Sequence, residues 1–176
     1  MIRTVIIALP FVLVLPAFAF TFPAPISQAE SGKVQCYQPN LEKKTCRSIS
    51  GFSAAKDGGF SNPATILVQA NPMITVHIVA PVTVKDGKTC GTIRQKDLDQ
   101  ALFSVDAAPA SAEQGASLHD QLNAVYKDMI GHEVCVTYVP DGDGFIARGE
   151  IDGAPQPNGD QHMIWVAPTD GYHVGP

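Results

Sequence analysis

Four cysteines constrain the fold of this 176-residue chain more than any other feature, because they follow a segment that is typical of export signals. Arg3 is the only charged residue before Glu30, and an apolar run over residues 5–20 contains an A-x-A pattern at residues 17–19. A short basic start, an apolar middle and small residues before the cut are typical of a secretory signal peptide. We expect residues 1–19 to be removed and the mature chain to fold in the periplasm or outside the cell.

An uncleaved membrane anchor is the alternative interpretation of this N-terminal segment. A spanning helix needs about 20 continuous apolar residues, whereas this run is shorter and contains Pro10 and Pro16. No second long apolar run follows it. We therefore expect no membrane contact after cleavage.

An even number of cysteines in an oxidising compartment indicates disulfides. Cys36, Cys46, Cys90 and Cys135 allow three connectivities, and we favour Cys36–Cys46 with Cys90–Cys135 because short loops are the easiest to close. The cysteine spacings are much longer than the C-x2-4-C pairs of structural zinc sites. A nucleophilic cysteine needs a free thiolate. We expect two structural disulfides, no metal at the cysteines and no cofactor.

Turn signals divide the rest of the chain into short strands. Asp86-Gly87 lies between β-branched residues and predicts a type I′ hairpin, because both residues tolerate a positive φ. Asn-Pro pairs at residues 62–63 and 71–72 predict two more turns. We expect strands at residues 33–37, 45–49, 64–69, 74–84, 133–139, 145–151 and 161–166, with Pro81 breaking the fourth or placing it at an edge.

One segment has the pattern of a long helix. Ser111 and Gln114 can form a capping box, and Gly131 suits a C-terminal cap. An apolar stripe at helical spacing follows the capping box: Leu118, Leu122, Val125 and Met129. The sequence therefore predicts an α+β fold over residues 33–176, a mostly antiparallel sheet with one long helix packed on one face. Residues 20–32 form an extended lead-in, and residues 51–62 form an exposed loop.

Two similar segments occur in the second half of the chain. Residues 104–109 (SVDAAP) resemble residues 150–155 (EIDGAP). Each places an aspartate after a short β-branched stretch, so we interpret both as the same turn chemistry used twice.

Charge is divided unevenly between the two halves of the chain. Residues 20–97 carry more basic than acidic side chains, whereas residues 98–176 are strongly acidic. The net charge of −5 argues against nucleic-acid binding through general basicity. The acidic half is interpreted as a solvated face or a complement to the basic half; a docking surface for a basic or cationic partner is the alternative.

Oxygen ligands for a cation are only weakly indicated. Asp141 and Asp143 match the first positions of a calcium loop, but the required oxygen ligand and glycine are missing further on. A looser carboxylate cage of Asp141, Asp143, Glu150 and Asp152 remains a weak metal candidate, and a simple hairpin tip explains the same residues.

Catalytic motifs are incomplete throughout. The five histidines show no i, i+4 pair, and no G-x-S-x-G pattern occurs. His77 is interpreted as a structural residue of its strand. Trp165, Tyr172 and Phe145 are interpreted as core aromatics rather than as a ligand surface.

The C-terminal third resembles the ending of small exported proteins of alphaproteobacteria that have no assigned function. The resemblance rests on residues 141–145 (DGDGF), 164–166 (IWV) and 170–172 (DGY). It implies a periplasmic setting and transfers no catalytic residue.

These observations favour a non-catalytic exported domain that binds a ligand or serves the cell envelope. A hydrolase that gathers carboxylates and a histidine from distant segments is the first alternative. An inhibitor-like module that presents residues 51–62 to a partner is the second.

Mass spectrometry of the exported protein checks the export argument. We expect a mature chain that begins at Phe20 and a mass lowered by the two hydrogens that each of two disulfides removes. A full-length chain inside the cell with four alkylatable thiols would contradict this interpretation.

Overall fold

The computed structural model describes residues 21–176 of the chain. The predicted signal peptide, residues 1–19, lies outside the described residues. The predicted lead-in is only partly extended, since it contains the short 3-10 helix η1 (Ser27–Ser31) and the fully buried Ile26.

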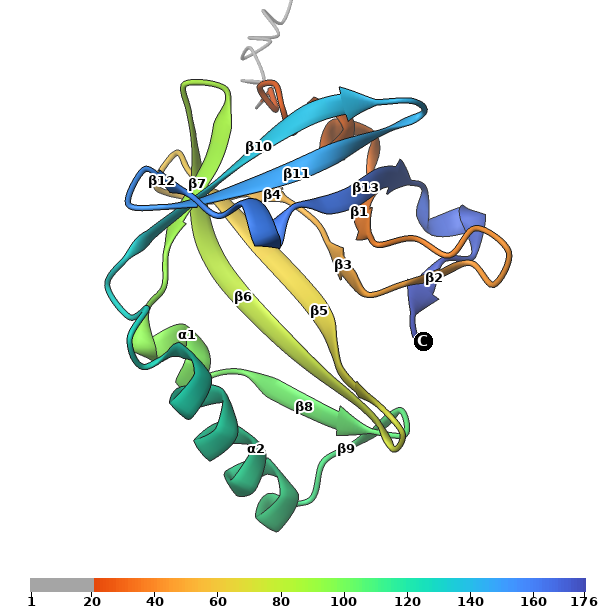
Figure 1. The fold of residues 1–176 in the computed structure, drawn as a ribbon, viewed down its shortest axis with the longest axis vertical. Helices are drawn as coiled ribbons and strands as arrows, with labels where there is room; N and C mark the ends of the chain where they lie inside the picture. The colour runs from red at the N-terminus through yellow and green to blue at the C-terminus, as the bar shows by residue number, and fades with distance from the viewer. Residues whose placement is uncertain (1–20) are drawn as a thin grey trace, which may run out of the picture.

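Eight antiparallel strands form a closed barrel (Figure 1). Each of these strands pairs with the next barrel strand along the chain, and the last pairs with the first. In chain order the strands are β1 (Val34–Tyr37), β3 (Ser48–Ser50), β5 (Phe60–Ala70), β6 (Met73–Lys85), β7 (Lys88–Thr92), β10 (Glu133–Asp141), β11 (Gly144–Ile151) and β13 (Gln161–Val166). The ring closes where Val34 pairs with Val166 and Tyr37 with Met163.

The helices α1 and α2 belong to an insertion between β7 and β10 (Figure 1). The insertion contains α1 (Gln95–Asp99), β8 (Leu102–Val105), β9 (Ala108–Pro109) and α2 (Ala112–Tyr126). It is held to the barrel by pairing of β8 with the first residues of β6. The remaining short elements are β2 (Thr45–Cys46), β4 (Ser53–Ala54), β12 (Ala154–Pro155), η2 (Pro157–Gly159), η3 (Pro168–Asp170) and β14 (His173–Val174).

The predicted α+β class, a sheet with one long helix packed on one face, is wrong. The chain is mostly β, and its sheet closes on itself. The capping box of Ser111 and Gln114 is present at the start of α2 as predicted, but no residue of α2 is buried. Leu118 and Leu122 pack against a core cluster, whereas Val125 of the same stripe is 70% exposed. The local pattern identified the helix and overestimated how much of it is covered.

The two hydrophobic clusters lie on different faces of the barrel wall. On β1, Val34 and Cys36 face an outer cluster with Val166, while Gln35 and Tyr37 face a cavity on the other side. A second cluster of Val76, Ala101 and Phe103 lies where the insertion meets β6. Because side chains alternate along a strand, Val76 shares a face of β6 with Ile78, which packs against this cluster and also lines the cavity.

Both favoured disulfides are confirmed. Cys36 bonds to Cys46 with 5.4 Å between their Cα atoms. Cys90 on β7 bonds to Cys135 directly opposite it on β10. The first disulfide joins β1 to β2, and β14 pairs with β2 in parallel. The C-terminal residues are therefore attached to the outer surface of the barrel.

Two prolines lie inside strands where the sequence predicted interruptions. Pro63 lies within β5 rather than in a turn, whereas Pro72 does lie in the turn between β5 and β6. Pro81 lies within β6, which continues through it. β7 pairs with β6 only from Thr83 onward and β8 only up to His77. Pro81 therefore lies where β6 has a strand on one side only, and a missing N–H is tolerated there.

The predicted exposed loop, residues 51–62, is partly structured. β4 forms a small hairpin with the start of β5, and Phe60 is buried. The Phe52 ring contacts the Trp165 ring, with 6.2 Å between their centroids. The solvent-exposed residues of the segment are those of β4 and residues 56–58 at its tip.

The two similar segments form the same hairpin. Asp106 and Ala107 join β8 to β9 with φ values of 48° and 66°, and Asp152 and Gly153 join β11 to β12 with 48° and 79°. Each aspartate accepts a hydrogen bond of 2.9 Å from the first backbone N–H of a barrel strand, Met73 or Glu133. The interpretation of one turn chemistry used twice is confirmed.

Exchanging the residues at the second turn position should change stability in opposite directions. Ala107 adopts a left-handed conformation that disfavours a Cβ, whereas Gly153 adopts it with open space within 4 Å of the point where a Cβ would lie. We expect Ala107→Gly to raise the free energy of unfolding by about 0.5–1 kcal/mol and Gly153→Ala to lower it by about the same amount. Denaturant unfolding measures both, and a loss of stability in Ala107→Gly would contradict the backbone argument.

Candidate ligand cavity

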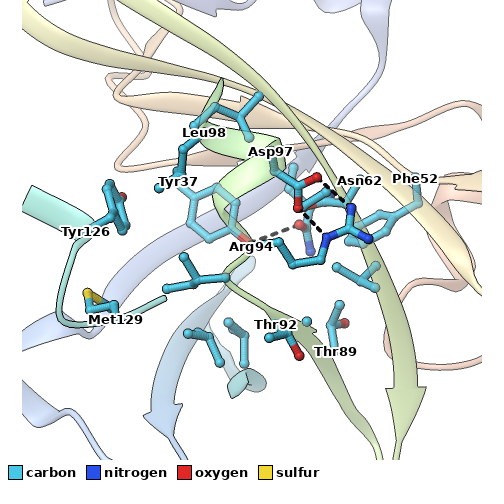
Figure 2. A pocket seen from close by; sticks show the side chains of 18 of the residues that line it. Tyr37, Phe52, Asn62, Thr89, Thr92, Arg94, Asp97, Leu98, Tyr126 and Met129 are labelled. Carbon is cyan, nitrogen blue, oxygen red and sulfur yellow. Dashed lines mark hydrogen bonds and ion pairs between the residues drawn. The ribbon is translucent and has the colours of Figure 1, made fainter. Parts of the chain in front are cut away.

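The inner face of the barrel forms a partly open cavity of about 380 Å³ (Figure 2). Its walls come from inward-facing residues of β1, β5, β6, β7 and β10, and residues of the insertion border one end. Ala80, Val136 and Thr89 represent three different strands of this wall. Most of the lining is apolar, and a group of aromatic rings adds to it: Tyr37, Phe52, Tyr126 and Tyr138.

A small polar network lies on one wall of this cavity. Gln35 is fully buried, and its Oε1 atom accepts hydrogen bonds from the hydroxyls of Tyr37 at 2.9 Å and Ser50 at 3.1 Å. The Tyr138 hydroxyl lies 3.5 Å from the same oxygen and 3.2 Å from the Tyr37 hydroxyl. The network fixes the Gln35 side chain from several directions.

Two polar atoms of the interior have no hydrogen-bond partner among the described residues. They are Nε2 of Gln35 and Oγ1 of Thr89, both on residues that line the cavity. Gln35 is 0% exposed and Thr89 is 7% exposed. Buried polar groups are nearly always hydrogen-bonded, and an unpaired one costs about 1–3 kcal/mol. Both residues line the cavity, so a molecule bound there lies beside two polar groups that have no partner among the described residues.

An ion pair borders the cavity beside α1. The Arg94 guanidinium donates to the Asp97 carboxylate through two nitrogens, with Nε 2.8 Å from Oδ2, and Figure 2 shows the two groups pointing toward each other. Asp97 is 5% exposed. The hydrogen bond with Asp97 raises the pKa of Arg94 above its usual range. The two charges satisfy each other and leave no net charge there.

The interior disfavours a negative charge on Tyr37. Burial of the phenol raises its pKa well above the ordinary value, and the neighbouring Tyr138 raises it further, while the hydrogen bond with Ser50 acts in the opposite direction. Desolvation is the largest of these causes, because it penalises the phenolate.

The weak metal candidates lie at two ends of the β10–β11 hairpin. Asp141 and Asp143 lie at its tip, where Asp141 is 3.5 Å from His162. Glu150 lies near the other end and forms an ion pair of 2.7 Å with Lys88. This pair also joins the acidic half of the chain to the basic half. Asp152 hydrogen-bonds to His132 beyond the end of β11, so the four carboxylates do not form one cage.

The Asp152 carboxylate is engaged by His132 and by the backbone N–H of Glu133. The hydrogen bond from His132 lowers its pKa, and the backbone N–H of Glu133 lowers it further.

His77 is partly buried and hydrogen-bonds to Thr65 on the neighbouring strand, which agrees with its interpretation as a structural residue. Among the described residues that line the cavity there is one carboxylate, Asp97, and no histidine.

Cys90, Glu133 and Cys135 place potential ligand atoms within 4.8 Å of one another. The two sulfurs are bonded to each other, so neither is a thiolate that could bind a metal. This group is a disulfide beside an exposed carboxylate.

Sequence reasoning did not identify the cavity residues. Gln35 and Tyr37 are alternate residues of a correctly predicted strand, and Thr89 lies beside a cysteine that was singled out for its sulfur. Two of the aromatic residues that the sequence singled out do not line the cavity. Tyr172 packs in the outer cluster, and Trp165 contacts the cavity-lining Phe52. A glutamine between apolar residues of a short strand was the available signal.

No family model, no curated protein and no solved structure matches this chain significantly. None of the helices formed by residues 21–176 is long and apolar enough to cross a membrane.

Alkaline titration tests the environment of Tyr37. Ordinary tyrosines ionise near pH 10, and we expect the Tyr37 phenol of the native chain to stay protonated well above that pH. Because the unfolded state releases this proton first, stability is complete below about pH 10 and falls as the pH rises above it. Phenolate absorbance measures the ionisation, and just above pH 10 we expect the native protein and Tyr37→Phe to give equal absorbance. A higher phenolate absorbance in the native protein than in Tyr37→Phe at that pH would contradict the assignment.

Proposed function

We propose that the mature protein is a non-catalytic exported binding protein that holds a small, mostly apolar molecule inside its barrel. The observation that carries the proposal is the cavity of about 380 Å³ lined by two buried polar atoms that lack a partner among the described residues. Closed barrels of eight strands have an interior just wide enough to be filled by side chains or to hold one small ligand. Here the interior side chains leave space, which supports the second arrangement.

The composition of the cavity lining supports binding rather than catalysis. Ligand pockets are mainly apolar and aromatic, with a few polar groups that fix the orientation of the bound molecule. The lining has this composition, with Gln35 and Thr89 as the polar groups. The carboxylate–histidine hydrolase has no comparable support, because Asp97 is engaged with Arg94 and His132 is engaged with Asp152.

Two disulfides support an oxidising, extracellular environment for the folded chain. The protein works in the periplasm or after secretion. A receptor or carrier for a small molecule in that setting needs no resident cofactor.

Fluorescence of N-phenyl-1-naphthylamine tests this function. The probe is uncharged, has no carbonyl group and becomes bright in apolar surroundings. We expect saturable binding to the wild-type protein and binding weakened by roughly tenfold or more in Ala80→Phe, because the larger side chain occupies the cavity.

Val79→Phe is the matched control. Val79 is the neighbouring residue on β6, does not line the cavity and is 47% exposed. This variant should bind the probe as the wild type does. Circular dichroism shows whether Ala80→Phe is folded, and Ala80→Leu provides a smaller obstruction if it is not. Equal binding by wild type and a folded cavity-filled variant, or no binding by the wild type, overturns the proposal.

A further inference from the structure

The described residues that line the cavity include more than one hydrogen-bonding group, but their hydrogen-bonding needs differ. Some groups are already paired with one another, as in Arg94–Asp97 and Tyr37–Gln35. The amide nitrogen of Gln35 and the hydroxyl of Thr89 are not. We propose that the ligand is an uncharged, ring-containing molecule with a carbonyl-type oxygen that accepts hydrogen bonds from these two groups. This inference rests on the proposed function and assigns its ligand class.

The orientation of the Gln35 amide follows from its neighbours. Three hydroxyls, those of Tyr37, Ser50 and Tyr138, converge on one end of the side-chain amide. An amide oxygen accepts several hydrogen bonds, whereas an NH₂ group has only two hydrogens to donate. The end that receives three hydroxyls is therefore the oxygen, and the NH₂ group is left without a partner among the described residues. An NH₂ group donates to an acceptor, and a carbonyl-type oxygen of the ligand supplies one.

Thr89 adds a second group on the opposite wall. β1, which carries Gln35, and β7, which carries Thr89, lie four places apart in the ring of eight strands. A molecule that fills the interior therefore meets a polar group on each side. The Thr89 hydroxyl can donate to the same class of acceptor, and it can also accept from a ligand hydroxyl.

Charge argues against an anionic ligand. Arg94 and Asp97 neutralise each other, and Asp97 is almost completely buried. A carboxylate ligand would lose its hydration beside a guanidinium whose charge Asp97 already balances, so it would bring a second negative charge to one positive charge. The raised pKa of Tyr37 indicates the same property of the interior, because burial there penalises a negative charge.

Cavity size sets the scale of the molecule. An apolar cavity of about 150 Å³ in another protein binds benzene, and the cavity here measures about 380 Å³. A molecule of two or three fused or linked rings fits this space. Aromatic side chains in the lining, Phe52 and Tyr126 among them, favour a flat ring system.

Three naphthalene derivatives of similar shape test the ligand class. They are 2-acetylnaphthalene, which is a ketone, 2-isopropylnaphthalene, which has no acceptor, and 2-naphthoate, which is an anion at pH 7. In equilibrium dialysis we expect the ketone to bind roughly tenfold more tightly than the hydrocarbon, and the anion to bind more weakly than either.

Thr89→Val assigns the preference to a residue. The substitution keeps the shape and removes a hydroxyl that has no partner among the described residues, so the fold should be retained. We expect the affinity for the ketone to fall by roughly three- to tenfold and the affinity for the hydrocarbon to stay the same or rise. Thr83→Val is the matched control, because Thr83 lies on the neighbouring strand β6, is solvent-exposed and does not line the cavity, and it should leave the ratio unchanged.

The outcomes separate this inference from the function beneath it. If N-phenyl-1-naphthylamine binds in the cavity but the ketone, hydrocarbon and anion bind equally, the ligand class is wrong and the binding function stands. Tightest binding of 2-naphthoate likewise overturns the ligand class. A ketone preference that persists unchanged in Thr89→Val removes Thr89 from the assignment. If none of the probes binds, the proposed function fails as well.

Discussion

Pairing of β1 with β13 is the interaction on which the rest of the structure depends. It joins residues 34–37 to residues 163–166 and converts an open meander into a closed ring. An open sheet would expose unpaired backbone groups at both edges, and its inner face would have no opposite wall. The same four residues of β1 face two environments: Cys36 is bonded to Cys46 in the outer cluster, and Gln35 carries the polar network of the interior. Closure of the sheet therefore creates the cavity and fixes its most buried polar residue.

Features determined by neighbouring residues could be predicted from the sequence. The Asp86-Gly87 hairpin, the capping box of α2 and the repeated aspartate turn all depend on residues within one turn of each other, and all three are present. The disulfide pairing also followed from short loops. Barrel closure could not be predicted in this way, because no local pattern distinguishes a strand at the edge of a sheet from one that meets the other end of the chain. The helix is present, but its predicted packing on one face of an open sheet was wrong for a related reason: the apolar stripe indicates a helix but not how much of it the rest of the fold covers, and Val125 is left exposed.

The cavity residues were hidden from sequence reasoning by the alternation of strand side chains. On β1 the sequence Val-Gln-Cys-Tyr is correctly interpreted as a strand, but alternation defines two faces without saying which one is enclosed. Polar residues on the inner face of a closed sheet then resemble polar residues on a solvated face. Gln35 and Thr89 therefore gave no signal until the ring was known, whereas the exposed carboxylates Asp141 and Asp143 drew attention because they are close in sequence.

Energetics connects the unfilled interior with binding. A folded domain is stable by only about 5–15 kcal/mol, and each buried polar group without a partner costs about 1–3 kcal/mol. Thr89 and Gln35 each place such a group at the cavity. A valine at position 89 would keep the shape and remove the free-energy cost of the unpaired hydroxyl. Larger side chains at small interior positions such as Ala80 would remove the unfilled volume. A ligand that supplies an acceptor to both groups and fills the apolar space recovers this free energy only in the folded state, so binding and stability are coupled. Under the proposed function, the residues that make the barrel less stable when it is empty are therefore also the residues that would select the ligand.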